Sequence, residues 1–188
     1  DFIYVCLQDD KQCKSGWQAI NRNWELAKKC LPIMCKEFKL KGLLIGRKNC
    51  NIDVSCKNLI TIEGDENNIG KIPYNDFQKK LSQSKFLFMP NIRDASPRVL
   101  SEALVIDVPA LVNKNIYGGW KYINEQTGEF FDEHNFKSVL RKLLQKIKQN
   151  QYSPRQWFTQ RFGPEKTGKR LRDFIKQIYP DLWDCKYC

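Results

Sequence analysis

The segment from Asn91 to Val112 holds the residues whose types and spacing best suit chemistry. A polar loop follows an apolar run and leads into a stretch of helical character, with Asp94 in the loop and Glu102 eight residues later. The first turn of a helix presents backbone N–H groups and a partial positive charge, which suit a phosphate. A carboxylate two turns into the helix can accept hydrogen bonds from a ribose. The segment therefore predicts a site for a phosphorylated, ribose-bearing ligand.

Each of these residues also has a structural interpretation. Glu102 could be a solvent-facing helix residue, and Asp94 a turn residue or helix cap. The pair Gly118–Gly119 could be a tight turn, and Lys14 one surface lysine among many. The sequence alone leaves both interpretations open.

The elements that must position these residues are predicted from apolar runs that alternate with helical stretches. The expected strands are 2–7, 42–46, 59–62, 86–90 and 109–112. The expected helices are 15–36, 73–84, 97–106 and 136–148, with further short helices from 152 onward. Strands that alternate with helices, and that are apolar throughout, predict a doubly wound α/β fold with a parallel sheet. In such folds ligands bind beyond the carboxyl ends of the strands, which is where Asp94 falls.

Several classes of protein are excluded by what the sequence lacks. It has neither the glycine-rich dinucleotide motif after the first strand nor a P-loop, which argues against nicotinamide enzymes and P-loop NTPases. The single histidine, His134, excludes a site built from several imidazoles of this chain, and we expect it on the surface. No apolar run is long enough to cross a membrane, and no secretory signal is evident.

The eight cysteines predict neither a metal site nor a disulfide framework. Only Cys185 and Cys188 have the C-x-x-C spacing, and no second pair with suitable spacing accompanies them. We expect mostly free thiols and no bound metal. Free thiols favour a reducing compartment, so the predicted location is the cytoplasm or the cytosolic face of a membrane.

The net charge of +11 is concentrated near the C-terminus. Residues 137–176 contain twelve Lys or Arg and only two acids. Such a run is typical of a solvated face, but it could also hold an anionic acceptor, a membrane surface or a partner domain. We expect a first domain over 1–150 and a basic helical extension over 151–188. Within the first domain, the residues at helical spacing are Trp17, Ile20, Trp24, Ala27 and Leu31, and the stripe of Trp17 and Trp24 is predicted to pack in the core.

The segment from Asn91 to Val112 resembles the E-x7-E region of the retaining GT-B glycosyltransferases, the group that is similar to glycogen synthase and sucrose synthase (glycosyltransferase family 4-like, group 1). The matching residues are Asp94, Ser96, Pro97, Glu102, Ala103, Leu104, Val108 and Pro109. Asp94 stands where the family usually has Glu, and Asp107 where Gly is frequent. Other segments match in the same order over residues 1–150, namely 14–16, 43–47, 60–64, 73–74, 117–123 and 127–131.

The resemblance implies a Rossmann-like, nucleotide-sugar-binding domain, the C-terminal half of a GT-B enzyme. It implies transfer of a hexosyl group from a UDP- or GDP-sugar, with retention and with neither metal nor other cofactor. Asp94 would contact the donor sugar and Glu102 the ribose, as the catalytic pair. Lys14 would pair with the diphosphate, which amides of 96–99 would cradle. The implied donor-binding residues are Lys14, Arg47, Ser96, Pro97, Arg98, Val99, Glu102, Gly118 and Gly119.

The implied partners are a nucleotide sugar and an acceptor glycan, lipid or protein. An N-terminal acceptor-binding domain, in cis or in trans, and peripheral membrane contact are further expectations. The family's Arg near the first strand is missing, and Lys11, Arg93 or Arg98 could substitute for it. One alternative is therefore a non-catalytic nucleotide-sugar-binding module. Another is a nucleic-acid-binding protein that uses the basic C-terminal region, although this region lacks clear aromatic stacking platforms.

Overall fold

The protein folds around a single six-stranded parallel sheet in the order β3-β2-β1-β4-β5-β6. The computed structural model describes residues 1–7, 16–46, 57–62 and 72–180. The strands are β1 (Phe2–Val5), β2 (Gly42–Ile45), β3 (Leu59–Ile62), β4 (Phe86–Met89), β5 (Ala110–Asn113) and β6 (Gly128–Phe131). All five strand pairings are parallel. The order runs outward in both directions from β1 and β4, so the predicted doubly wound sheet is confirmed.

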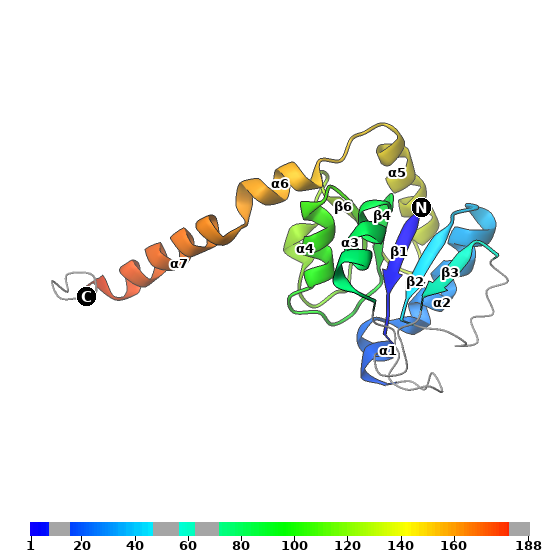
Figure 1. The fold of residues 1–188 in the computed structure, drawn as a ribbon, viewed down its shortest axis with the longest axis horizontal. Helices are drawn as coiled ribbons and strands as arrows, with labels where there is room; N and C mark the ends of the chain where they lie inside the picture. Colours follow the sequence, from blue (N-terminus) through cyan, green and yellow to red (C-terminus); the bar gives the residue numbers. More distant parts are fainter. Residues whose placement is uncertain (8–15, 47–56, 63–71, 181–188) are drawn as a thin grey trace.

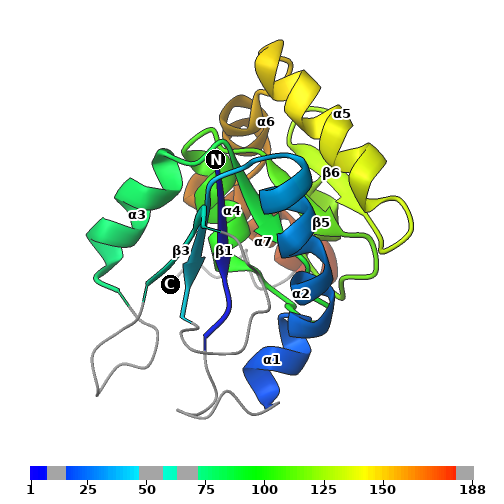
Figure 2. The same cartoon turned by 90° about the vertical axis from the view of Figure 1, so that its right-hand side faces the viewer.

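Helices cover both faces of the sheet (Figure 2), with α2 and α5 on one side and α3 and α4 on the other. The α-helices are α1 (Trp17–Asn21), α2 (Trp24–Pro32), α3 (Tyr74–Ser82), α4 (Arg98–Val105), α5 (Phe136–Lys148), α6 (Pro154–Arg161) and α7 (Pro164–Ile178). A π-helical turn, η1 (Ile33–Glu37), continues α2, and a 3-10 turn, η2 (Trp120–Tyr122), follows β5.

The strands are buried on both faces, which explains why they read as continuous apolar runs. In β1, Phe2 and Tyr4 pack in the core beneath α2 and α5, whereas Ile3 packs in the core beneath α3 and α4. All four residues of β4 are buried. The central strands are therefore held rigidly, and the loops that leave their carboxyl ends start from fixed points.

The helix expected over 15–36 is interrupted. Asn23 adopts a left-handed backbone (φ 51°), and its side chain accepts a hydrogen bond from the amide of Leu26, which caps α2. The break shifts the helical phase, so the predicted core packing is wrong for Trp17, which is 69% exposed; Ile20, on the same short helix, is 56% exposed. Trp24, which lies beyond the break, is buried as predicted.

The cysteines only partly follow the prediction of free thiols. Cys6 and Cys30 are buried thiols that form no disulfide, and burial raises the pKa of the Cys30 thiol. Cys35 is disulfide-bonded, which contradicts the prediction for this residue. His134 is exposed just before α5, as expected.

The two C-terminal helices differ in how they contact the body. The Phe158 ring of α6 lies 5.6 Å from that of Tyr122, and the amide of Arg155 donates to Asp107 Oδ1 at 3.1 Å. Helix α7 extends away from the body (Figure 1) and buries none of its residues, so Leu171 and Phe174 are exposed. Among the described helices, none combines the length and the apolar character needed to span a membrane.

Candidate functional site

Two loops at the carboxyl end of the sheet interlock, one after β4 and one after β5. The amide of Asp94 donates to the carbonyl of Tyr117 at 3.1 Å, and the amide of Tyr117 donates to the carbonyl of Ile92 at 2.6 Å. A Cβ on Gly118 would lie 2.4 Å from the backbone oxygen of Asp94, so only glycine permits this approach. Gly119 packs in the same way against Pro97.

The glycine pair therefore does more than make a turn. Gly118 and Gly119 have φ angles of 97° and 73°, which favour glycine, and they hold the loop that carries Asp94 and Pro97 at the start of α4. Four of the predicted site residues thus lie in one structural unit. Ser96 is exposed in the same loop.

A pocket of about 360 Å³ lies between the carboxyl ends of β1 and β2 and the first turns of α3 and α4, beside the point between β1 and β4 where the strand order reverses. Arg98, Val99 and Glu102, all predicted from the sequence, line it together with Tyr74. This is the place where doubly wound sheets bind ligands. The fold thus brings three of the predicted residues into one cavity beside the first turn of α4.

Glu102 is half-buried and faces this pocket rather than open solvent. Burial raises the pKa of its carboxyl above the ordinary value, although the Arg98 charge and a hydrogen bond from the Tyr74 hydroxyl act in the opposite direction. A partly desolvated carboxylate with a neighbouring phenol and guanidinium is suited to accept hydrogen bonds from ligand hydroxyl groups.

Asp94 forms an ion pair that the sequence did not indicate. The Arg22 guanidinium contacts Asp94 Oδ2, and the Asn91 side-chain amide donates to the same oxygen at 3.2 Å. The carbonyl of Arg22 in turn accepts a hydrogen bond from the Tyr4 hydroxyl at 3.0 Å. A guanidinium therefore stands beside Asp94, but it comes from Arg22 and not from the expected substitutes.

Arg22 was not predicted as a site residue because it falls inside the stretch expected to be one helix. It is the residue that caps α1, directly before the left-handed Asn23. An Arg-Asn pair within a helical pattern was the only local signal of a break. Lys14 and Arg47, which the resemblance assigned to the donor, and Lys11 lie outside the described residues.

The Arg22–Asp94 pair should stabilise the fold as well as the loop. Both side chains are largely buried, so Arg22→Ala leaves a half-buried carboxylate with Asn91 as its remaining partner. We expect a loss of about 1–3 kcal/mol in the free energy of unfolding, measured by urea denaturation. The double variant Arg22→Ala/Asp94→Ala should lose less than the sum of the single variants. Additive losses would contradict the pairing.

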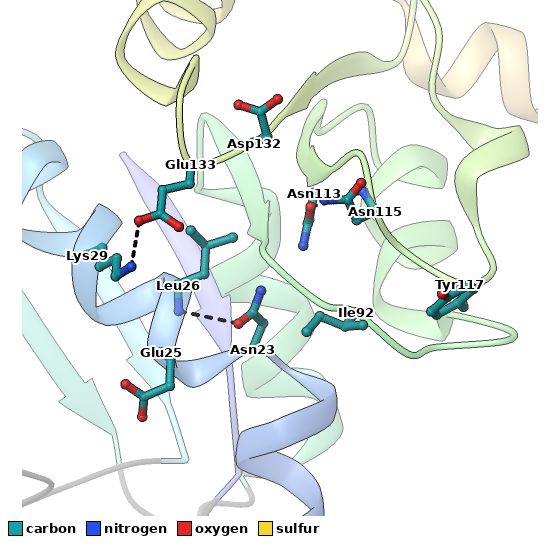
Figure 3. A pocket seen from close by; sticks show the side chains of 10 residues that line it. All are labelled: Asn23, Glu25, Leu26, Lys29, Ile92, Asn113, Asn115, Tyr117, Asp132 and Glu133. Atoms are coloured by element: carbon teal, nitrogen blue, oxygen red, sulfur yellow. Dashed lines mark hydrogen bonds and ion pairs between the residues drawn. The ribbon is translucent and has the colours of Figure 1, made fainter.

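A second pocket, of about 320 Å³, lies on the other side of the loop that follows β4 (Figure 3). It is formed by the first turns of α2 and by the segments that follow β4, β5 and β6. Its polar groups include Asn23, Asn115, Tyr117 and Glu133. None of these four residues was predicted as functional. Asn23, Asn115 and Glu133 belong to no motif, and Tyr117 was noted only as the residue before the glycine pair.

Neither a protein-family model nor the sequence of a curated protein matches this chain. Solved structures do match its fold. One is WaaG, a glycosyltransferase involved in lipopolysaccharide biosynthesis, with a TM-score of 0.59 and 16% identity over 84% of this chain and 42% of WaaG. Another is the catalytic domain of cholesterol-α-glucosyltransferase from Helicobacter pylori, with a TM-score of 0.56 and 10% identity over 83% of this chain and 94% of that domain.

These similarities establish the fold, which is that of GT-B glycosyltransferases. The chain spans less than half the length of WaaG. At this level of sequence identity, the structural similarities establish nothing about the ligand of either pocket.

Proposed function

We propose that the chain binds a nucleoside-diphosphate sugar in the pocket between α3 and α4, as the donor-binding part of a glycosyltransferase. The observation that carries this proposal is that Arg98, Val99 and Glu102 line one pocket beside the point where the strand order reverses. The glycine-locked loop that carries Asp94 adjoins this pocket. The fold, shared with glycosyltransferases, supports the same conclusion.

Each residue has a role in this proposal. Glu102 accepts hydrogen bonds from the ribose hydroxyl groups, and Tyr74 orients its carboxylate. The first turn of α4, with Ser96, Pro97, Arg98 and Val99, faces the diphosphate, where N–H groups and a guanidinium stabilise negative charge. Asp94, oriented by Arg22, lies near the donor sugar. Lys14 and Arg47 complete the proposed donor set, and Gly118 and Gly119 hold it in shape.

The proposed reaction is a substitution at the anomeric carbon. The bond from this carbon to the diphosphate oxygen breaks, and a bond to an acceptor hydroxyl oxygen forms. The departing phosphate accepts the proton of that hydroxyl, so the step needs no histidine base. Fixed positive charge at the diphosphate lowers the barrier because negative charge grows there as the bond breaks. We propose retention of configuration, a hexosyl donor and no metal requirement on the basis of the sequence resemblance.

The remaining partners are also proposals. Because the chain spans 42% of WaaG, we propose that another domain, in cis or in trans, supplies most of the acceptor site for a glycan, lipid or protein. A cytoplasmic location fits a nucleotide-sugar donor, but the Cys35 disulfide argues against it, since disulfides are rare in reducing compartments. Nucleic-acid binding is not favoured, because the solved structures that share this fold are glycosyltransferases.

The test is ligand-induced stabilisation by UDP-, GDP-, ADP- and dTDP-sugars. A ligand at about 100 times its Kd should add about 2.7 kcal/mol, which raises the melting temperature by about 5–10 °C. We expect one nucleotide to give this shift, and Glu102→Ala to weaken its binding by about 10–100-fold, because charge-assisted hydrogen bonds are lost. Glu165→Ala, on exposed α7, is the matched control and should bind as the wild type does.

The pH dependence gives a second check on Glu102. Because its pKa is raised, its carboxylate takes up a proton at a higher pH than an ordinary glutamate does. Nucleotide affinity should therefore fall as the pH is lowered through that raised pKa, and Glu102→Gln should remove this part of the dependence. No stabilisation by any of the four nucleotides, or equal weakening by Glu165→Ala, would contradict the proposed function.

A further inference from the structure

The second pocket lies next to the proposed donor site and shares a wall with it. Ile92 lines the pocket, and the same short loop carries Asp94 two residues later. On the other wall, Asn23 lines the pocket directly after Arg22, the ion-pair partner of Asp94. The backbone hydrogen bonds between 92–94 and Tyr117 separate the two sites. A ligand in this pocket would therefore sit beside the proposed position of the donor sugar.

Two polar side chains of the pocket wall, Asn113 and Asp132, form hydrogen bonds within the protein that fix the shape of the pocket. Asn113 donates to the carbonyl of Pro90 at 3.0 Å and accepts from the amide of Asn115 at 3.0 Å. Asp132 Oδ1 accepts from the amides of His134 and Asn135, and Oδ2 contacts Lys114. These two side chains, which the fold buries, make the floor rigid and leave ligand contacts to their neighbours.

The neighbouring side chains keep hydrogen-bonding capacity for a ligand. Asn23 uses its oxygen for the α2 cap, and Figure 3 shows its amide nitrogen directed toward Asn113 across the pocket. The side chains of Asn115 and Tyr117 form no hydrogen bond with another described residue, and Tyr117 is 71% exposed at the rim. Glu133 uses Oε1 for Lys29 at 2.5 Å, which holds its pKa below the ordinary value, so its other oxygen remains an acceptor at neutral pH.

This set of groups suits a neutral sugar ring. Sugar hydroxyl groups both donate and accept, so they pair with carboxamides and carboxylates together, whereas their C–H faces pack against an aromatic ring such as Tyr117. The volume of about 320 Å³ lies within the range of small-ligand sites. Each of the three carboxylates that line the pocket is paired with a lysine: Glu25 with Lys28, Asp132 with Lys114 and Glu133 with Lys29.

These ion pairs leave the wall without a net charge, which disfavours charged ligands. The cation among the described lining residues, Lys29, is already paired with Glu133, so a diphosphate would gain less here than at the first turn of α4. A bound metal ion is not favoured either, because no group of three His, Cys, Asp or Glu side chains in the described part of the chain is placed to hold one. Neutral polyhydroxyl compounds remain as the class of ligand that matches the hydrogen-bonding groups of the pocket.

We propose that this pocket binds a neutral sugar ring of the acceptor, so that this chain contributes to acceptor recognition beside its donor site. This inference rests on the proposed function, because an acceptor exists only if the donor pocket binds an activated sugar. It assigns ligand contacts to Asn23, Asn115, Tyr117 and Glu133. Asn113 and Asp132 are positioning residues, since their own hydrogen bonds shape the floor.

The experiment is an NMR titration of the ¹⁵N-labelled chain with methyl glycosides of glucose, galactose, mannose and N-acetylglucosamine, with and without saturating UDP or GDP. For a single ring we expect a Kd on the order of millimolar, which such a titration resolves. At least one glycoside should shift the side-chain amide signals of Asn23 and Asn115 saturably, and it should do so with the nucleotide bound. Tyr117→Ala and Asn115→Ala should weaken this binding by about tenfold or more.

Two controls separate the pocket from general surface effects. Tyr117→Phe keeps the ring and should retain most of the affinity. Trp120→Ala removes another exposed aromatic ring, outside the pocket, and should have no effect. Both substituted side chains are exposed, so we expect these variants to fold.

The outcomes distinguish this inference from the proposed function. Nucleotide signals at Glu102 and Tyr74 without any glycoside signal at Asn23 and Asn115 would overturn the acceptor site and leave the donor site intact. If only an intact nucleotide sugar shifted the Asn115 amide, the pocket would belong to the donor, which also overturns the inference. Glycoside binding without any nucleotide binding would refute the proposed function, and with it the acceptor assignment.

Discussion

Replacing Gly118 with alanine should abolish most nucleotide-sugar binding and lower the stability of the protein. The residue has φ 97°, and a Cβ would lie 2.4 Å from the Asp94 carbonyl oxygen and 2.6 Å from the Ala95 Cα. Both atoms belong to the backbone, so the loop that carries Asp94 must move. The backbone strain alone costs about 1–3 kcal/mol, and a displacement on the order of 1 Å at a site can reduce function by about 100-fold.

The matched control for this prediction is Gly163→Ala. Gly163 also has a positive φ, of 127°, but no atom lies within 4 Å of its added Cβ. This variant therefore carries the backbone strain without the clash and without any contact with the site. Melting temperature and nucleotide affinity should be measured for both variants. If Gly118→Ala bound the nucleotide as Gly163→Ala does, the interlocked loops would not be what positions the site.

The largest loss of stability is expected for Phe88→Ala. Phe88 is 1% exposed in the middle of β4, and its ring centroid lies 5.4 Å from that of Tyr4 and 5.5 Å from that of Phe131. Removing this ring deletes its packing and leaves a cavity between strands and helices. We expect a loss of about 3–5 kcal/mol in the free energy of unfolding, measured by urea denaturation. Because β4 leads directly into the Asp94 loop, nucleotide affinity should fall as well.

Trp17→Ala is the control, since it removes a larger aromatic side chain from the surface. Trp17 is 69% exposed, so its removal should change the stability by about 0.5 kcal/mol or less. This pair of variants also tests the break between α1 and α2. If Trp17→Ala were as destabilising as Phe88→Ala, the continuous core stripe expected from the sequence would be right and the observed exposure of Trp17 wrong.

The architecture could be predicted from the sequence because burial of a strand or helix produces a pattern of apolar residues in its own segment. Strands covered on both faces must be apolar at every position, and β4 shows this in four consecutive buried residues. Helix α5 was predicted with its observed ends because its apolar positions keep a helical period over 136–148. The glycine pair and the Asp94–Glu102 spacing indicated a ligand-binding edge, since these are local patterns of loop and helix start.

The tertiary structure decided which segments far apart in the chain contact one another. Arg22 meets Asp94 across 72 residues, and the second pocket joins the start of α2 to the ends of β5 and β6. Residues such as Asn23 and Asn115 carry no local signal, because their relation depends on strand order and on where α2 begins. Periodicity along a chain reports which side chains are buried, but not which distant side chains meet. The fold class was therefore readable from the residues themselves, whereas the ion pair at Asp94 and the second pocket exist only once the sheet has brought its strand ends together.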